Sequence, residues 1–203
     1  MYCKNESEFL DLYGCHEFGY EDHFCHCYSL DNDTSTLVIH PEDPTTEFLK
    51  GVYFKKSFNV IKDPFIDSSS IEEYIIDHDK IICLGHGSES GLFGAMGMII
   101  DFSLVPILKE KELVCIWCNA DQFMVKNNLT GLYSGMFISE IREANMYKIK
   151  ATQEQITASN DLFASLLGKY LDYKGDILAK LKKEYHIKDN PITTFNSNRL
   201  YST

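Results

Sequence analysis

The sequence is poor in positive charge. Among its 203 residues the only arginines are Arg142 and Arg199, and the formal net charge is −11 at pH 7. Proteins bind nucleic acid and anionic membranes largely through clustered lysine and arginine side chains. The composition therefore argues against nucleic acid and anionic membrane surfaces as partners.

Long apolar runs are also missing. No stretch reaches the eighteen or so uninterrupted apolar residues that a membrane helix needs, and residues 1–6 lack the basic and apolar pattern of a signal peptide. The chain contains no glycine-rich phosphate loop and no internal repeat. These absences predict a cytoplasmic protein that does not cross a membrane.

The cysteines lack the spacing of a disulfide framework. Their number, seven, is odd, and Cys83, Cys115 and Cys118 fall on apolar, strand-like runs. Small secreted domains with disulfides instead have an even number of cysteines in a loop-rich fold. We therefore expect free thiols.

The N-terminal region contains residue types that bind zinc. They are Cys15, His16, His23, Cys25, His26 and Cys27. Structural zinc sites usually present pairs of ligands two to four residues apart on a turn, and this spacing fits no familiar layout. An edge strand that packs on the sheet is the simpler interpretation, so we predict no metal and no other cofactor.

Apolar strand-like runs alternate with helical patterns over residues 36–119. This alternation is typical of right-handed βαβ units and a mostly parallel sheet. A hydrophobic content of 44% in 203 residues suffices for one core. We expect a single domain, residues 1–203, with an N-terminal extension or edge strand at 1–35, a core at 36–175 and a C-terminal helix and tail at 176–203.

The expected elements follow from hydrophobic period and capping residues. Strands are expected at residues 36–40, 57–61, 80–86, 113–118 and near 147–151. Helices are expected at 45–53 after Asp43-Pro44, between 67–70 and 80, at 98–112 as a crossover, at 157–173 and at 175–185. Pro106 places a helix start near Leu104 or a kink. The region around Gly131 is expected to be a loop, and residues 190–203 an irregular tail.

Two of the strands end in a reactive side chain. Residues 81–85 lead to His86, and residues 113–117 lead to Cys118. Neighbouring parallel strands deliver their last residues to the same carboxyl edge of a sheet. There an imidazole activates a thiol by taking its proton or, as the cation, by stabilising the thiolate. The pattern predicts a catalytic pair of His86 and Cys118.

Cys118 is the candidate nucleophile because of its position. It ends its apolar run and precedes Asn119, whereas Cys83 and Cys115 are flanked by apolar residues on both sides, as is usual for an inert core thiol. On the period of a strand, Cys115 faces the opposite side of the sheet from Cys118. Acidic residues near strand ends are mostly solvated caps, so Asp101 is not assigned a catalytic role.

The two motifs resemble the caspase-like group of cysteine peptidases, which includes caspases, gingipains, separases, CHAT domains and self-cleaving domains of clostridial toxins. In that group an apolar strand ends in His-Gly, matched by His86-Gly87, and the next strand ends in the nucleophile, matched by Cys118. The turn at residues 88–94 is similar to the hairpin that these enzymes insert before the next helix. The resemblance implies a three-layer α/β sandwich with a mostly parallel central sheet and helices on both faces.

The resemblance also implies an activity. The chain would be a cysteine endopeptidase that acts on a protein or peptide substrate, with the amides of Gly87 and Cys118 as the oxyanion hole. Ser88, Asn119 and Asp121, which lie close to the two motifs, are candidate substrate-binding residues. The substrate residue beside the cut and the oligomeric state stay open.

The specificity position departs from the best-known relatives. Caspases place glutamine, and metacaspases aspartate, two residues before the nucleophile, where this chain has Ile116. Caspases also bind the substrate aspartate with arginine side chains, and arginine is nearly absent from this chain. Activation by inositol hexakisphosphate, as in the toxin members, would need a basic cradle, and we predict no such activator.

Two other interpretations remain from the sequence. One is a caspase-like fold whose site is silent and which binds partner proteins; it predicts an ordinary thiol pKa at Cys118. The other is a doubly wound domain that binds small molecules, in which His86 and Cys118 do not approach each other. This second alternative lacks a phosphate loop.

Overall fold

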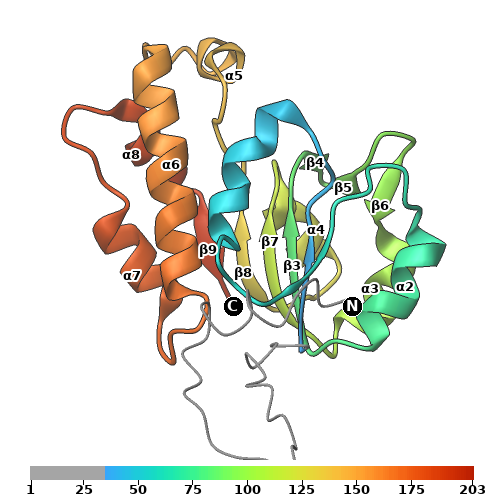
Figure 1. Ribbon diagram of the computed structural model, residues 1–203. Helices are drawn as coiled ribbons and strands as arrows, with labels where there is room; N and C mark the ends of the chain where they lie inside the picture. Colours follow the sequence, from blue (N-terminus) through green and yellow to red (C-terminus); the bar gives the residue numbers. More distant parts are fainter. Residues whose placement is uncertain (1–34) are drawn as a thin grey trace, which may run out of the picture. The chain divides into compact units, whose positions relative to one another are not determined.

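The structure, a computed structural model, describes residues 35–203, which form one compact unit. Its centre is a six-stranded sheet in the order β2-β1-β3-β7-β8-β9 (Figure 1). The strands are β1 (Thr36–Ile39), β2 (Asn59–Ile61), β3 (Lys80–Leu84), β7 (Glu112–Ile116), β8 (Gly131–Ser134) and β9 (Leu200–Ser202). Neighbouring strands are parallel except β8 and β9, which are antiparallel. The prediction of a mostly parallel sheet is confirmed.

Alternating apolar residues bury both faces of the central strands. Ile81 and Leu113 are neighbours in register and belong to a core on one face, while Ile82 and Val114, one residue further along, belong to a core on the other face. Each such side chain contributes about 1.5–3 kcal/mol when it is fully buried. A near-continuous apolar run is therefore what a doubly covered parallel strand requires.

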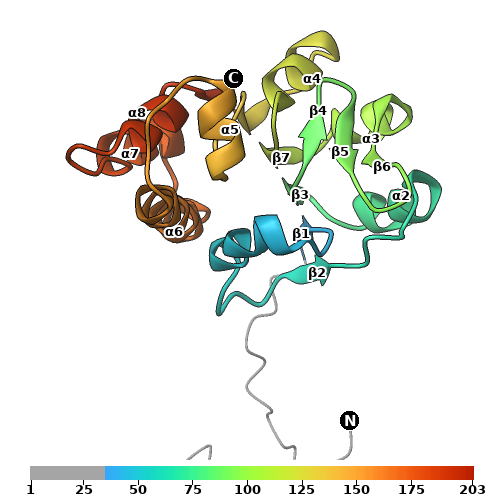
Figure 2. The same cartoon turned by 90° about the horizontal axis from the view of Figure 1, so that it is seen from above.

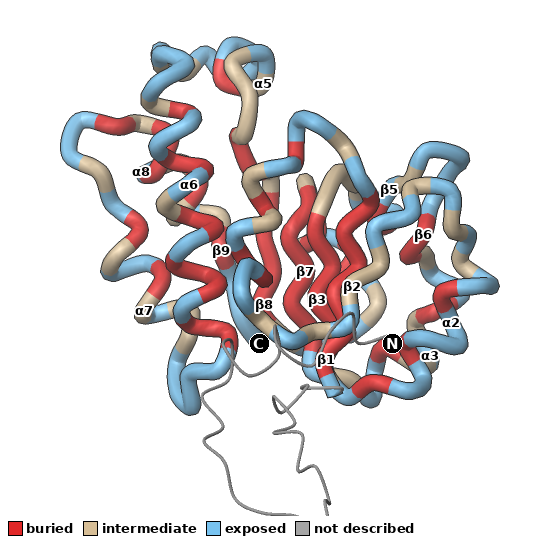
Figure 3. The backbone as a smooth tube through the Cα atoms, in the orientation of Figure 1, coloured by how far each residue is buried: buried red, intermediate tan, exposed pale blue. Residues whose placement is uncertain are grey.

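Helices cover the two faces and give three layers (Figure 2). One face carries α2 (Ser68–Ile76), α3 (Val105–Leu108) and α4 (Ala120–Lys126). The opposite face carries the 3-10 helix η1 (Pro44–Val52), α6 (Gln153–Tyr170) and α7 (Ile177–Glu184). The short helices α5 (Ile141–Met146) and α8 (Pro191–Ser197) contribute to a third, smaller core. The predicted three-layer α/β sandwich is confirmed, and Figure 3 shows its buried residues concentrated in the central strands.

Capping residues define where the helices start. The Asp43 carboxylate accepts from the Thr45 amide at the start of η1, and Pro44 occupies the first turn, as expected. At α6, Thr152 and Gln155 form a capping box. These caps hold η1 and α6 in place against the sheet.

A small antiparallel sheet follows β3. It consists of β4 (Gly87–Ser88), β5 (Gly91–Phe93) and β6 (Met98–Ile100), and the 3-10 helix η2 (Phe102–Leu104) connects it to α3. Gly91 has φ +141°, and a Cβ atom there would lie 1.8 Å from the Ile100 carbonyl oxygen. Only glycine fits at this tight turn. The hairpin begins directly after His86.

The structure corrects the expected crossover helix at residues 98–112. The segment instead forms β6, η2 and α3, because Met98 and Ile100 pair with β5 and the Asp101 carboxylate caps η2. Pro106 lies in the first turn of α3, close to the expected helix start.

Three further expectations in the C-terminal half are wrong. Residues 147–151 form no strand: Lys148 takes φ 56°, and the Ile149 amide bonds back to the Ala144 carbonyl, which closes α5 with a Schellman motif. Residues 190–203 contain α8 and β9, since Asn190 caps α8 ahead of Pro191. Gly131 begins β8 and not a loop.

The expected extension or edge strand at residues 1–35, with its cysteine and histidine cluster, lies outside the described residues. Within residues 35–203, the cysteines Cys83, Cys115 and Cys118 are free, as expected. None of the helices in this range has the length and apolar character needed to span a membrane.

Candidate functional site

The strands that carry His86 and Cys118 lie side by side. β3 and β7 pair in parallel up to Leu84 and Ile116, and the Gly85 amide extends the pairing by donating to the Ile116 carbonyl at 3.1 Å (Figure 1). His86 and Cys118 each lie two residues beyond the last pair, Leu84 and Ile116. The register therefore places the two reactive side chains at the same carboxyl edge of the sheet, as the sequence predicts.

One small cavity is lined by both reactive side chains. Its volume is about 20 Å³. The lining residues are Thr46, Phe48, Leu49, Gly85, His86, Ile116, Trp117, Cys118, Phe137 and Ser139. A cavity of this size accommodates roughly one water-sized group. The space between the imidazole and the thiol therefore has room for one small group.

A threonine and a carboxylate hold the His86 ring. His86 Nε2 lies 2.6 Å from Thr45 Oγ1, and Thr45 Oγ1 donates to Asp43 Oδ1 at 2.5 Å. Because the hydroxyl has only one proton, Thr45 must accept from a protonated Nε2. The neutral ring then keeps its lone pair on Nδ1. The contacts thus select the tautomer that leaves Nδ1 free to accept a proton.

The Asp43 carboxylate also lies next to the His86 ring. Its Oδ1 lies 3.5 Å from His86 Nε2. Hydrogen bonds from Thr45, together with the charge of His86, lower the pKa of the Asp43 carboxyl. The carboxylate is therefore ionised at neutral pH, with one oxygen beside the His86 ring.

The Cys118 thiol is protonated in the resting site. Its Sγ lies 3.5 Å from the Phe137 carbonyl oxygen and 3.9 Å from Glu143 Oε1. Burial, with a further contribution from the Glu143 carboxylate, raises the pKa of the thiol to about 11. Within residues 35–203, no hydrogen bond joins Cys118 to His86. The resting site therefore holds a neutral thiol and not a thiolate and imidazolium pair.

The loop after β8 supplies the contacts to the thiol. The second oxygen of the Glu143 carboxylate accepts from the amides of Ser139 and Glu140, at 2.7 and 3.1 Å. The buried Asn196 side chain bonds both the amide and the carbonyl of Ile138. These bonds fix the loop and with it the wall of the cavity next to Cys118.

Gly87 packs against the ring of Trp117. A Cβ atom at Gly87 would lie 2.2 Å from that ring. The Phe93 amide donates to the His86 carbonyl, so His86 and Phe93 are a hydrogen-bonded pair of the antiparallel ladder. Such pairs alternate with pairs that share no backbone hydrogen bond, and Gly87 and Leu92 are therefore a pair of the second type. The Gly87 amide therefore points away from β5, as an oxyanion donor requires.

The candidate substrate-binding residues lie outside the small cavity. The Ser88 carbonyl accepts from Trp117 Nε1 at 3.0 Å. Asn119 takes φ 66° at the start of α4. Asp121 sits beside Gly135 and Tyr201, and its buried Oδ1 has no hydrogen-bond partner among the described residues. None of the three lines the space between His86 and Cys118.

Several residues of the site were not expected from the sequence. Asp43 and Thr45 do have a signal in the sequence, because Asp43-Pro44 predicts the start of a helix. No sequence pattern links this helix start to His86. Phe48 and Phe137 are apolar residues on elements whose placement only the tertiary fold decides. Glu143 lies on α5, a helix that the sequence pattern did not predict.

Across residues 35–203, no group of three or more His, Cys, Asp or Glu side chains is arranged to hold a metal ion. His40 is buried against Tyr53 and Thr46, and burial lowers its pKa to about 4.

Comparison with family models, with curated proteins and with solved structures found no match to this chain.

We expect alkylation of Cys118 by iodoacetamide to accelerate about tenfold per pH unit between pH 7 and pH 10, without a plateau near pH 8.5. Only the thiolate reacts, and the thiol pKa of about 11 keeps its fraction low and rising through this range. The measurement is the rate of mass increase mapped to Cys118. A plateau below pH 9 in the folded protein would contradict the resting state described above.

Two comparisons sharpen this experiment. The chain unfolded in urea provides the ordinary thiol, whose rate should be half-maximal near pH 8.5 and level off about one pH unit higher. Glu143→Gln keeps an acceptor for the loop amides but removes the negative charge 3.9 Å from the sulfur. It should raise the alkylation rate at pH 8 relative to the wild type, because a nearby carboxylate disfavours the thiolate.

Proposed function

We propose that the chain is a caspase-like cysteine endopeptidase that uses a pair of Cys118 and His86. The observation that carries this proposal is the small cavity that both side chains line at the carboxyl ends of β3 and β7. The hairpin of β4, β5 and β6 supports it, because it follows His86 where the caspase-like group inserts a hairpin. Protein or peptide substrates are the partners, and no cofactor is required.

The mechanism starts from the neutral thiol. Cys118 turns from the Phe137 carbonyl into the cavity, gives its proton to His86 Nδ1, and its sulfur forms a bond to the scissile carbonyl carbon. The amides of Gly87 and Cys118 donate to the resulting oxyanion. His86 returns the proton to the leaving amine as the C–N bond breaks. Water, deprotonated by His86, then hydrolyses the thioester and regenerates the thiol.

Asp43 and Thr45 contribute to each proton transfer. The imidazolium that forms when His86 takes a proton is stabilised by the Asp43 carboxylate, 3.5 Å from Nε2. Thr45 holds the ring in the tautomer that leaves Nδ1 free to accept. This is the orienting role that a third residue plays in nucleophile and base pairs.

A cytoplasmic location belongs to the same proposal. Cys83 and Cys115 are free and adjacent in register, and they remain unlinked as expected for a reducing compartment. The net charge of −11 supports protein and not nucleic acid as the substrate.

A second candidate function is a silent caspase-like module that binds partner proteins. The raised pKa of Cys118 favours it, because an activated cysteine usually has a lowered pKa. The peptidase and the module differ in whether a bound peptide carbonyl is attacked.

Cleavage of a mixed peptide library tests the peptidase directly. Mass spectrometry of the products should show new termini with the wild type and none with Cys118→Ala. Cys115→Ala is the matched control, since it removes a buried thiol from the same strand and should leave cleavage intact. Cleavage that persists in Cys118→Ala, or its absence with the wild type at neutral pH, would favour the silent module.

A further inference from the structure

We propose that this peptidase cuts after small uncharged residues, glycine or alanine. The inference rests on the proposed function and concerns the side chain of the substrate residue that supplies the scissile carbonyl. Within the described residues, the cavity that touches both Cys118 and His86 is the space next to the attacked carbon. Its size, its walls and its lack of charge each limit what can enter.

Size is the first limit. The cavity has a volume of about 20 Å³, which accommodates roughly one water-sized group. A methyl group is of this size, whereas leucine, lysine or phenylalanine would need several times the space. Each extra methylene that does not fit a pocket changes the rate by roughly 10- to 200-fold. The cavity therefore favours alanine, and glycine leaves it unfilled.

Rigid walls are the second limit. Leu49, Ile116 and Phe137 line the cavity and are each at least 95% buried. The Phe137 ring packs 4.7 Å from the Phe163 ring, and it stacks on Phe48 with a centroid distance of 6.5 Å. Enlarging the cavity would require the core around these rings to repack, and protein interiors resist such changes. On the side of these three residues the cavity therefore resists a larger side chain.

The absence of charge is the third limit. The lining contains no Asp, Glu, Lys or Arg, and its ionisable groups are the two reacting side chains themselves. A substrate aspartate, lysine or arginine would be buried there without a partner, which is strongly unfavourable. Asp43 and Glu143 point their carboxylates at His86 and at the loop amides, so they are already engaged.

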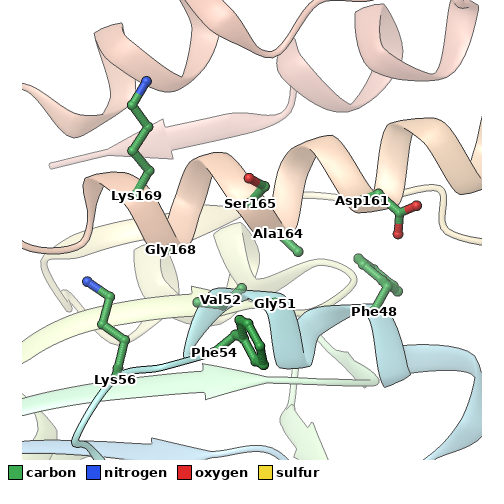
Figure 4. A pocket seen from close by; sticks show the side chains of 10 residues that line it. All are labelled: Phe48, Gly51, Val52, Phe54, Lys56, Asp161, Ala164, Ser165, Gly168 and Lys169. Carbon is green, nitrogen blue, oxygen red and sulfur yellow. The ribbon is translucent and has the colours of Figure 1, made fainter.

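Larger spaces lie next to the site, but they do not touch Cys118. One of about 120 Å³ is lined by His86, Pro41 and Phe93. Another, of about 480 Å³, is the groove between η1 and α6, with Lys56 and Lys169 at one end and Phe48 at the other (Figure 4). These spaces suit flanking substrate residues and not the one that is cut.

Phe48 separates the catalytic cavity from the groove, because its side chain lines both. Removing the ring should join the two spaces and admit a larger substrate side chain. Phe48 is only partly buried, so its loss is tolerated better than that of Phe137. Phe54→Ala is the matched control. Phe54 lines the groove but not the catalytic cavity, and it is 70% exposed.

Peptidyl acyloxymethyl ketones that differ only in the residue before the reactive ketone provide the test. Labelling of wild-type Cys118 should be at least about tenfold faster with alanine than with leucine, lysine or aspartate. Phe48→Ala should raise the leucine rate relative to alanine by about tenfold or more, and Phe54→Ala should leave the ratio unchanged. Thermal unfolding of each variant checks that it is folded.

The outcomes separate this inference from the peptidase itself. Leucine, lysine or aspartate probes that label the wild type as fast as alanine would overturn the small-residue preference while supporting the peptidase. An unchanged alanine to leucine ratio in folded Phe48→Ala would overturn the role of the cavity. No labelling by any probe, together with an uncut peptide library, would overturn both.

Discussion

Replacing His86 by alanine should lower the rate of peptide hydrolysis by about 10²- to 10⁴-fold, the range that a positioned acid or base contributes. The effect is large because the Cys118 thiol has a pKa of about 11 and needs a base to lose its proton at neutral pH. The free energy of unfolding should change little, since the His86 side chain is 38% exposed. Initial rates on the best peptide from the library, together with urea unfolding, measure both quantities.

His186→Ala is the control for this substitution, because His186 is an exposed histidine far along the chain on the segment after α7. It should leave the rate unchanged. Thr45→Val adds a second arm: it removes the oxygen that accepts from His86 Nε2 at 2.6 Å and keeps the shape of the side chain. A smaller loss in Thr45→Val than in His86→Ala is expected, because the base remains but its tautomer is no longer fixed.

A rate in His86→Ala within about threefold of the wild type would contradict the mechanism, since no general base contributes so little. In that case the proton of Cys118 would have to leave by another route. Glu143, whose carboxylate lies 3.9 Å from the sulfur, is the group to replace next.

The pairing of β3 with β7 could be predicted from the sequence because local patterns determine it. The apolar runs that end at Leu84 and Ile116 are long enough for buried parallel strands, and each is followed by a chemically reactive residue. Parallel topology then brings His86 and Cys118 to one edge without any knowledge of the loops. The central sheet and the location of the two side chains follow from this alone.

The surroundings of the pair could not be predicted in the same way, because they depend on contacts distant in sequence. Thr45 meets His86 across 41 positions of chain. The loop that holds Phe137 is fixed by Asn196, 58 positions from Ile138, on a helix that was expected to be irregular tail. No local period signals such bonds. The raised pKa of Cys118 follows first from its burial in the tertiary fold, so it could not be inferred from the motif.

Two local signals were also misinterpreted. The sequence pattern favours a loop at Gly131, yet its φ of +146° and the close approach of the Leu113 carbonyl make it the first residue of β8. The Asn190-Pro191 pair is a helix start, like Asp43-Pro44, but was not treated as one. Both errors concern the part of the chain after Cys118, one at a strand and one at a helix.

Gly87→Ala should disable the site even if the fold survives. The new methyl group would lie 2.2 Å from the Trp117 ring and 2.5 Å from the Gly91 carbonyl oxygen. Trp117 cannot yield easily, because it is 99% buried and its Nε1 donates to the Ser88 carbonyl. Overpacking of this kind costs about 1–3 kcal/mol, and the larger value corresponds to a fall in Tm of roughly 6–12 °C for a domain of this size.

Trp117 is the only tryptophan of the chain, so its fluorescence reports on this contact directly. Gly135→Ala is the matched control: a Cβ there would have its nearest neighbours at 3.4 Å, an ordinary contact, and its Tm and activity should match the wild type. In Gly87→Ala, the displaced ring shifts the emission spectrum, and hydrolysis falls because the β4 backbone that carries the Gly87 amide moves away from the oxyanion. If Gly87→Ala had the same Tm, emission spectrum and activity as the wild type, β4 would not pack against Trp117. The Gly87 amide would then not be held by this contact.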